Sequence, residues 1–121
     1  PAARRDLEAI THPRIGLGIL GWLQEQAQAG TAVAAVEAAL MVETGSHTRY
    51  DRLLVVACSP DVQLARLMAR DRVDEGAARQ WLGAQLPVRD KVALADAVVW
   101  NDGPPEARPG AGETAWAALG L

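Results

Sequence analysis

The sequence predicts an α/β fold in which helices flank a parallel sheet. Short apolar runs at 31–37, 52–58 and 96–101 have the length and composition of strands, and helical patterns separate them. Strands that alternate with helices are typical of βα units, whose strands run parallel. With 121 residues, 50% of them hydrophobic, the chain is long enough for one domain with a core of its own.

The N-terminal region predicts two helices with a break between them. Residues 4–10 have a helical pattern, which Thr11 and His12 interrupt. Pro13 suits the first turn of a new helix, because its missing N–H costs nothing there. Apolar residues at helical spacing continue this second helix, and Gly30 is expected to end it.

Three more helices are expected between the strands at 52–58 and 96–101. The segment 59–70 has Ser59 as its cap and Pro60 in its first turn, and further helical patterns cover 74–86 and 88–95. Residues 105–121 are rich in Pro and Gly. We expect them to form a loose tail with a last half-helix around Trp116.

Composition excludes several classes of protein. The net charge of −3 and the pI near 5.3 argue against a general nucleic-acid binder, which would present a basic face. Cys58 is the sole cysteine, so no internal disulfide can form and a cytoplasmic location is the expectation. No apolar run approaches the roughly 20 residues of a membrane span, and no Cys/His cluster has metal-ligand spacing.

Polar side chains that could bind an anion occur in four places. A helix that begins at Pro13 would offer free backbone N–H groups, and arginines three and four residues apart on one helix face suit a phosphate. Each place also has an ordinary interpretation as a capped helix start, a solvated helix face, a strand-end turn or a surface carboxylate. The four are His12-Pro13-Arg14, Gln63 with Arg66 and Arg70, Asn101-Asp102-Gly103, and Glu43.

Five short motifs, in order along residues 4–104, resemble the dephospho-coenzyme A kinase family. Each motif is loose by itself, and their order and spacing carry the resemblance. They are H-P-x-I at 12–15, R-L-x-x-R-D at 66–71, Gln85, K-x-x-x-A-D at 91–96 and N-x-G at 101–103. Where the family usually has Pro-Leu-Leu before the glutamate at 43, this chain has Ala39-Leu40-Met41.

The resemblance implies an incomplete P-loop kinase-like parallel sheet with flanking helices and a helical lid. Residues 1–104 would be the C-terminal two-thirds of the kinase domain, followed by the loose tail at 105–121. The implied reaction is phosphorylation of the ribose 3′-hydroxyl of dephospho-coenzyme A by ATP, the last step of coenzyme A biosynthesis. ATP would bring Mg²⁺ with it, and no metal held by the protein itself is implied.

The resemblance also implies roles for individual residues. Residues 1–30 would form substrate-binding helices and residues 59–86 the lid, which closes over the ATP phosphates and excludes water. The substrate-binding residues would be His12, Pro13, Arg14 and Glu43, the catalytic residues Arg66 and Arg70, and the ATP-binding residues Arg66, Asn101 and Gly103.

The family's first strand, its phosphate-binding loop with a lysine, and its aspartate base have no counterpart in these residues. Lys91 is the only lysine and follows Asp90, so no G-x-x-x-x-G-K-[ST] loop is present. The chain also opens without Met, directly in a helical pattern, and we expect a piece of a longer or processed protein. By itself it is expected to transfer no phosphate.

In the family, the missing strand lies between those that match 31–37 and 52–58. We expect the missing segment to lie outside this chain, the two strands to close on each other, or a second copy to fill the gap. Two other interpretations stay open. One is a non-catalytic remnant that binds nucleotide or coenzyme A, and the other is a structural α/β domain that pairs with another chain or with itself through an open strand edge.

Overall fold

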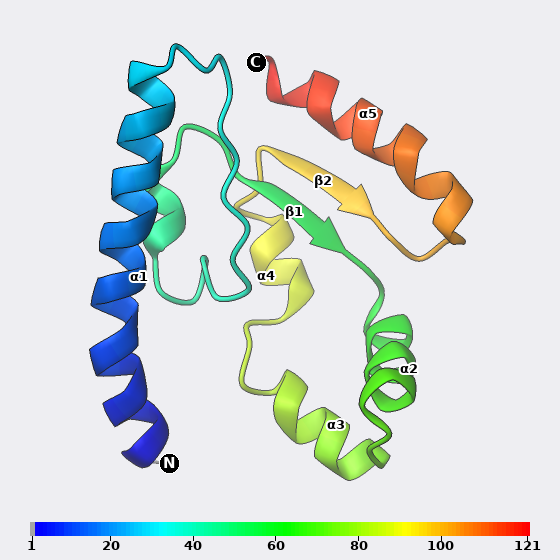
Figure 1. The fold of residues 1–121 in the computed structure, drawn as a ribbon. Helices are drawn as coiled ribbons and strands as arrows, with labels where there is room; N and C mark the ends of the chain where they lie inside the picture. The colour runs from blue at the N-terminus through cyan, green and yellow to red at the C-terminus, as the bar shows by residue number, and fades with distance from the viewer. Residues whose placement is uncertain (1) are drawn as a thin grey trace. The chain divides into compact units, whose positions relative to one another are not determined.

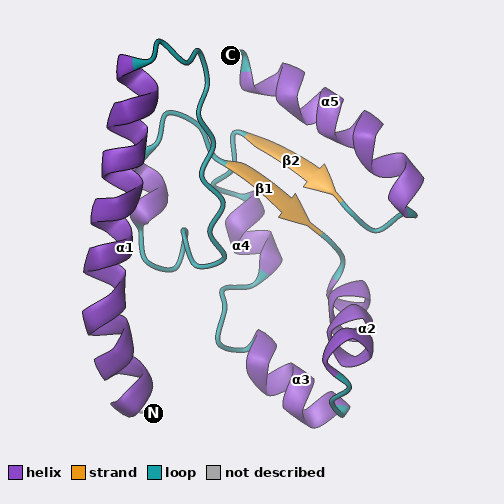
Figure 2. Cartoon of the chain, in the orientation of Figure 1, coloured by secondary structure: helices purple, strands orange, loops and turns teal. Residues whose placement is uncertain are grey.

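The computed structural model describes residues 2–121, so Pro1, at which the predicted substrate-binding segment 1–30 begins, lies outside it. The chain divides into two compact units, of which the first ends at Ala38 and the second comprises Ala39–Leu121. Figure 1 gives the order of the elements along the chain, and Figure 2 distinguishes helices, strands and loops. The two units are described separately.

The first unit is dominated by one long helix, so the predicted break at residues 11–13 is wrong. α1 (Ala2–Gln28) continues through Pro13 without interruption. Pro13 removes only one backbone hydrogen bond of the helix, and the Thr11 hydroxyl donates to the Leu7 carbonyl at 2.9 Å, inside the helix. Gly30 ends the helix as predicted, in the left-handed conformation with φ of 70°.

The predicted strand at 31–37 is not formed, and the structure has no strand at these residues. A strand is stable only when its backbone groups pair with a neighbouring strand. The described sheet has only two members, and both lie later in the chain. Without a pairing partner, the Ala- and Val-containing segment is irregular.

The other two predicted strands form a parallel pair, as the sequence predicts. β1 (Leu54–Ala57) pairs with β2 (Ala97–Trp100), with Val55 opposite Val98 and Val56 opposite Val99. The two arrows run side by side in the same direction in Figure 1. Both strands are short apolar runs rich in Val, which is the composition that favours a pleated, half-buried backbone.

Three helices connect β1 to β2 and confirm the predicted pattern. They are α2 (Pro60–Asp71), α3 (Glu75–Leu82) and α4 (Val88–Val92). Asp74 caps α3 by accepting a hydrogen bond from the Ala77 backbone N–H at 2.8 Å. Arg72, between α2 and α3, has φ of 53° and is the only non-glycine residue among 2–121 with positive φ.

The C-terminal segment differs from the predicted loose tail at 105–121. After the short 3-10 turn η2 (Pro105–Ala107) it forms α5 (Arg108–Leu119), a helix of 12 residues. Figure 1 shows α5 lying along β2. Pro109 occupies the first turn of the helix, where proline is tolerated.

The core of the second unit forms where α5 packs on the sheet. α5 packs on β2 largely through small side chains, which allow the helix to lie close to the strand. The Pro and Gly content of the segment does not predict this packing. The buried cluster comprises Ala97 and Val99 from β2 and Ala115 and Leu119 from α5, with Ala111 packed against it.

β1 is less well covered than β2. Its Val55 and Ala57 are buried, whereas Leu54 is 41% and Val56 is 64% exposed. Within residues 2–121, β1 has β2 as its only strand neighbour. No helix among the described residues is long and apolar enough to cross a membrane.

Candidate functional site

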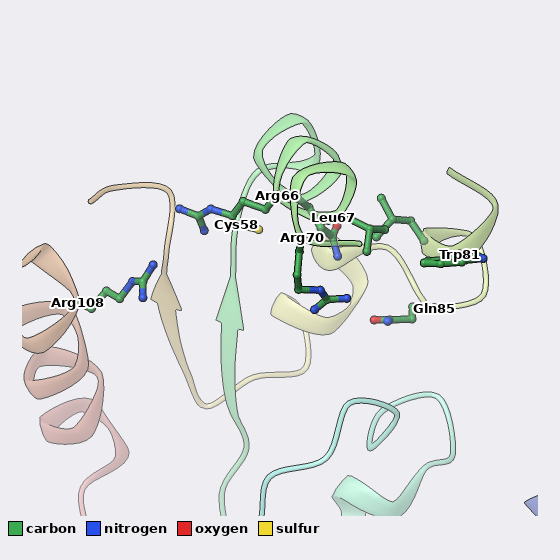
Figure 3. A pocket seen from close by; sticks show the side chains of 9 residues that line it. Cys58, Arg66, Leu67, Arg70, Trp81, Gln85 and Arg108 are labelled. Carbon is green, nitrogen blue, oxygen red and sulfur yellow. The ribbon is translucent and has the colours of Figure 1, made fainter. Parts of the chain in front are cut away.

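The second unit contains a cleft beyond the carboxyl ends of the two strands. Its volume is about 800 Å³. Ligands of parallel α/β proteins bind at this end of the sheet. Cys58, directly after β1, lines the cleft, and Figure 3 shows the side chains around the cleft. The remaining lining residues come from α2, from α3 and the turn after it, and from the start of α5: Gln63, Arg66, Leu67, Arg70, Trp81, Leu82, Gln85 and Arg108.

One face of α2 supplies the predicted polar residues of this cleft. Gln63, Arg66 and Arg70 lie three and four positions apart, so they share one helix face, and all three line the cleft. α2 begins at Pro60, two residues after Cys58, so its first turns lie close to the end of β1. The face that carries these side chains lines the cleft there. The sequence prediction that these side chains lie together is confirmed.

Arg66 contacts the loop that follows β2. Its Nη1 donates a hydrogen bond to the Asn101 carbonyl, and its Nη2 donates to the Gly103 carbonyl at 3.5 Å. The structure therefore brings together all three residues to which the resemblance assigns ATP binding. Their assignment to ATP stays a prediction.

Asp102 ties the ends of the two strands together. Its Oδ1 accepts from the Ser59 backbone N–H at 2.6 Å and from the Ser59 hydroxyl at 3.1 Å. Ser59 is the N-cap residue of α2, as predicted, and its carbonyl accepts from the Gln63 N–H at 2.9 Å, but its side chain makes no capping hydrogen bond to the helix. An N-D-G sequence indicates a turn, and that signal gave no hint of a bond between two strand ends.

Arg108 is a cleft residue that the sequence prediction missed. It is the first residue of α5, and its Nε donates to Asn101 Oδ1 at 2.9 Å. In Figure 3, Arg66 and Arg108 extend from two different helices toward the carboxyl end of β2. The segment had been expected to be loose, so no residue in it was assigned to a site.

Arg70 lines the same cleft but has a carboxylate partner. Its Nε and Nη2 each donate to Asp71 at 2.8 Å. These hydrogen bonds hold the pKa of the Asp71 carboxyl below its usual value; desolvation opposes them, and the positive charge of Arg70 adds to the lowering. The pair is exposed to solvent, so an anionic ligand could replace the Asp71 carboxylate on Arg70.

Glu43 lies in an ion pair, outside the lining of the cleft. Its Oε1 is 2.6 Å from Lys91 Nζ, and the two side chains are only 14% and 15% exposed, respectively. The same oxygen accepts from the Leu86 backbone N–H at 3.0 Å, and Lys91 also donates to Gln85 at 3.3 Å. Burial raises the pKa of Glu43, but hydrogen bonds from Lys91 and from backbone N–H groups, together with the Lys91 charge, outweigh burial and lower it.

The predicted residues His12, Pro13 and Arg14 lie on α1 in the first unit, and all three are exposed. The expectation that a helix start would present free N–H groups there is wrong, because α1 continues through the segment and uses those groups in its own hydrogen bonds. Their role toward a substrate rests on the resemblance alone and stays a prediction.

A metal centre formed by side chains has no support in the described part of the chain. Residues 2–121 contain no group of three or more His, Cys, Asp or Glu side chains that could hold a metal ion. The cleft is instead lined by three guanidinium groups, which attract anions.

A parallel sheet with an arginine-lined cleft beyond its strand ends is typical of α/β proteins that bind phosphate-containing ligands. Comparison with solved structures agrees. A dephospho-CoA kinase from Campylobacter jejuni superposes with a TM-score of 0.62 at 27% sequence identity, over 93% of this chain and 56% of that one. This likeness supports the P-loop kinase type of α/β fold.

The sequence comparisons identify the particular family. The dephospho-CoA kinase family model matches residues 1–106, and the chain belongs to this family. A dephospho-CoA kinase from Syntrophotalea carbinolica is 42% identical over 103 residues, which are 85% of this chain and 49% of that protein. One from Anaeromyxobacter dehalogenans is 44% identical over 110 residues, which are 91% and 52%. The chain thus spans about half the length of the curated relatives it matches.

Proposed function

We propose that this chain provides the lid and part of the substrate site of an enzyme that phosphorylates the ribose 3′-hydroxyl of dephospho-coenzyme A with ATP. In that reaction the 3′-hydroxyl loses its proton to a base, a bond forms between the 3′-oxygen and the γ-phosphorus, the bond from the γ-phosphorus to the bridging oxygen breaks, and ADP leaves. The observation that carries the proposal is the contact of Arg66, which lines the cleft, with the Asn101–Gly103 loop. Family membership supports the substrate class.

The arginines would bind the transferred phosphoryl group. Phosphoryl transfer depends on positioning and on stabilising negative charge. Arg66 and Arg70 lie one helical turn apart on α2 and can act on adjacent phosphates. Asn101 and Gly103 would lie beside the adenine, and packing of α2 against α3 would exclude water.

Mg²⁺ would enter as part of the ATP complex. Mg²⁺ commonly keeps several waters and binds phosphate oxygens with one or two carboxylates. Within residues 2–121 no side-chain cluster is suited to hold it alone. We assign no residue of the described chain to the ion.

The 121 residues contain no G-x-x-x-x-G-K-[ST] sequence, since the only lysine is Lys91. We therefore propose that this chain alone is inactive and needs a phosphate-binding loop from elsewhere. The test incubates the purified chain with ATP, Mg²⁺ and dephospho-coenzyme A and measures coenzyme A by mass spectrometry. Formation of coenzyme A at an ordinary enzymatic rate would refute this dependence on a loop lysine.

The proposed substrate site is tested by binding. Calorimetric titration of the chain with dephospho-coenzyme A should give saturable binding that weakens in Arg14→Ala. A matched control is Arg5→Ala, which removes the same charge from the same helix. Equal affinities for these two variants and the unaltered chain would contradict a role for α1 in substrate binding.

A second function, pairing of chains through β1, is favoured by the exposed Leu54 and Val56 beside an edge with no strand neighbour within residues 2–121. Unpaired edges bind further strands. We propose this as the alternative to catalysis, with a non-catalytic nucleotide-binding remnant as a third case. Light scattering over a hundredfold concentration range tests it, and Val56→Lys should abolish any association. A monomer at every concentration would exclude pairing of the chain with itself.

A further inference from the structure

Arg108 places a third arginine in the cleft, two residues beyond the last residue that the family model matches. The family model ends at residue 106, whereas Arg108 begins α5 and lines the same cleft as Arg66 and Arg70. Its position is fixed, because α5 is anchored to β2 through the buried Ala115 and Leu119. Arg108 is therefore held at the cleft by the core of the unit.

Arg66 and Arg108 meet on one residue. Arg66 donates to the main-chain carbonyl of Asn101, and Arg108 donates through Nε to the side-chain oxygen of Asn101. Both acceptors are neutral. Two positive guanidinium groups are thus hydrogen-bonded to the same residue. They repel each other, and an anion bound between them would relieve this repulsion.

No carboxylate of the described chain forms a direct ion pair with either arginine. Among residues 2–121, neither Arg66 nor Arg108 forms an ion pair, whereas Arg70 is paired with Asp71. The neighbouring Asp102 carboxylate accepts hydrogen bonds from Ser59 instead. Positive charge without a counter-ion, at the ligand-binding end of a parallel sheet, is the electrostatic signature of an anion site.

We propose that Arg66 and Arg108 together bind one phosphate group of the nucleotide, with Arg108 in direct contact with it. Arg108 uses Nε on Asn101, so its two terminal NH₂ groups are free to donate to phosphate oxygens in the bidentate geometry that guanidinium favours. Arg66 leaves the Asn101 and Gly103 carbonyls, which are weaker acceptors than a phosphate. The nucleotide as ligand rests on the proposed function, whereas the anion site itself rests on the two arginines.

Inorganic pyrophosphate is the probe that separates phosphate binding from base binding. Calorimetric titration of the 121-residue chain should give binding that weakens about tenfold in Arg108→Ala and in Arg66→Ala, as expected for loss of one charge-assisted contact. Arg89→Ala is the matched control, because Arg89 lies outside the cleft lining and its side chain is 87% exposed. Circular dichroism checks each variant, and Arg108→Gln replaces Arg108→Ala if the alanine variant does not fold.

Three results would overturn the inference. They are absence of pyrophosphate binding to the unaltered chain, equal affinity in Arg108→Ala and Arg89→Ala, and a loss confined to adenosine binding, which would make Arg108 a positioning residue for Asn101. The second of these results, combined with a loss in Arg66→Ala, would refute Arg108 as a ligand and leave the proposed kinase function intact. Pyrophosphate binding through both arginines, with ATP bound no more tightly than pyrophosphate, would support the anion site and count against the kinase function.

Discussion

Replacing Glu43 by Gln should destabilise the second unit through the loss of one charge. Glu43 Oε1 accepts from Lys91 at 2.6 Å and from the Leu86 N–H at 3.0 Å, with side chains 14% and 15% exposed. The amide of Gln keeps the size and one acceptor oxygen but leaves the half-buried ammonium unpaired. A hydrogen bond to a charged group contributes about 1.5–3 kcal/mol and a neutral one about 1 kcal/mol. We expect a loss of roughly 1 kcal/mol in the free energy of unfolding, the middle of the difference between these two values.

The chain offers a matched control for this substitution. Glu75 and Arg79 form an ion pair at 2.7 Å, nearly the same distance, but their side chains are 56% and 65% exposed. Glu75→Gln should therefore cost about 0.3–0.5 kcal/mol. Urea unfolding followed by circular dichroism measures both variants. Equal losses for Glu43→Gln and Glu75→Gln would refute the reasoning that burial makes the Lys91 pair strong.

The pH dependence gives a second readout of the same pair. Because the pKa of Glu43 is lowered in the folded chain, its stabilising effect is complete above the pKa that the group has when unfolded. The effect is lost as the pH falls through the lowered folded value. The difference in stability between Glu43→Gln and the unaltered chain should thus shrink on acidification, and a difference that persists in acid would contradict the ion pair as its cause.

Three further substitutions test other contacts. Asp102→Ala removes both hydrogen bonds to Ser59 and should lower the free energy of unfolding by about 1–2 kcal/mol in urea; no change would show that the strand ends are not tied there. Leu119→Ala should cost about 2–3 kcal/mol, since Leu119 is buried against β2, whereas a loose tail would give no loss. Asp71→Asn frees Arg70 and should tighten pyrophosphate binding about two- to fivefold by calorimetry, and weaker binding would count against Arg70 as a phosphate ligand.

Local patterns in the sequence predicted most of the second unit. Both strands are short apolar runs with turn residues after them, and Pro60 and Asp74 mark helix starts by their backbone and capping preferences. The shared face of Gln63, Arg66 and Arg70 follows from helical spacing alone. These features depend on residues within one turn or one strand, which is the range over which sequence patterns act.

Two of the errors concern contacts between distant segments, and one concerns a proline within a helix. A strand at 31–37 needs a partner that the described sheet lacks, so its apolar composition was insufficient. Pro13 suggested a helix start, yet a long helix tolerates the loss of a single hydrogen bond. α5 has Pro and Gly at a density typical of loops, and its packing on β2 through small side chains decides its structure.

The site was predicted in part, because only some of its residues belong to motifs that the sequence reveals. Arg66, Asn101 and Gly103 belong to recognisable motifs, and the structure brings them together. Arg108 has no motif around it and reaches the cleft only because α5 folds back along the sheet. Only its chain position, shortly after a strand-end loop, could have suggested it from sequence.

Arg72 has a left-handed backbone conformation at the end of α2, where the chain turns toward α3. This conformation costs a residue with a Cβ about 1–2 kcal/mol, so the turn between the two helices includes local backbone strain. A negative φ at Arg72 would relieve this cost only by changing the direction of the chain between α2 and α3. Glycine, which adopts positive φ without a Cβ penalty, would keep the same chain direction with the local strain removed.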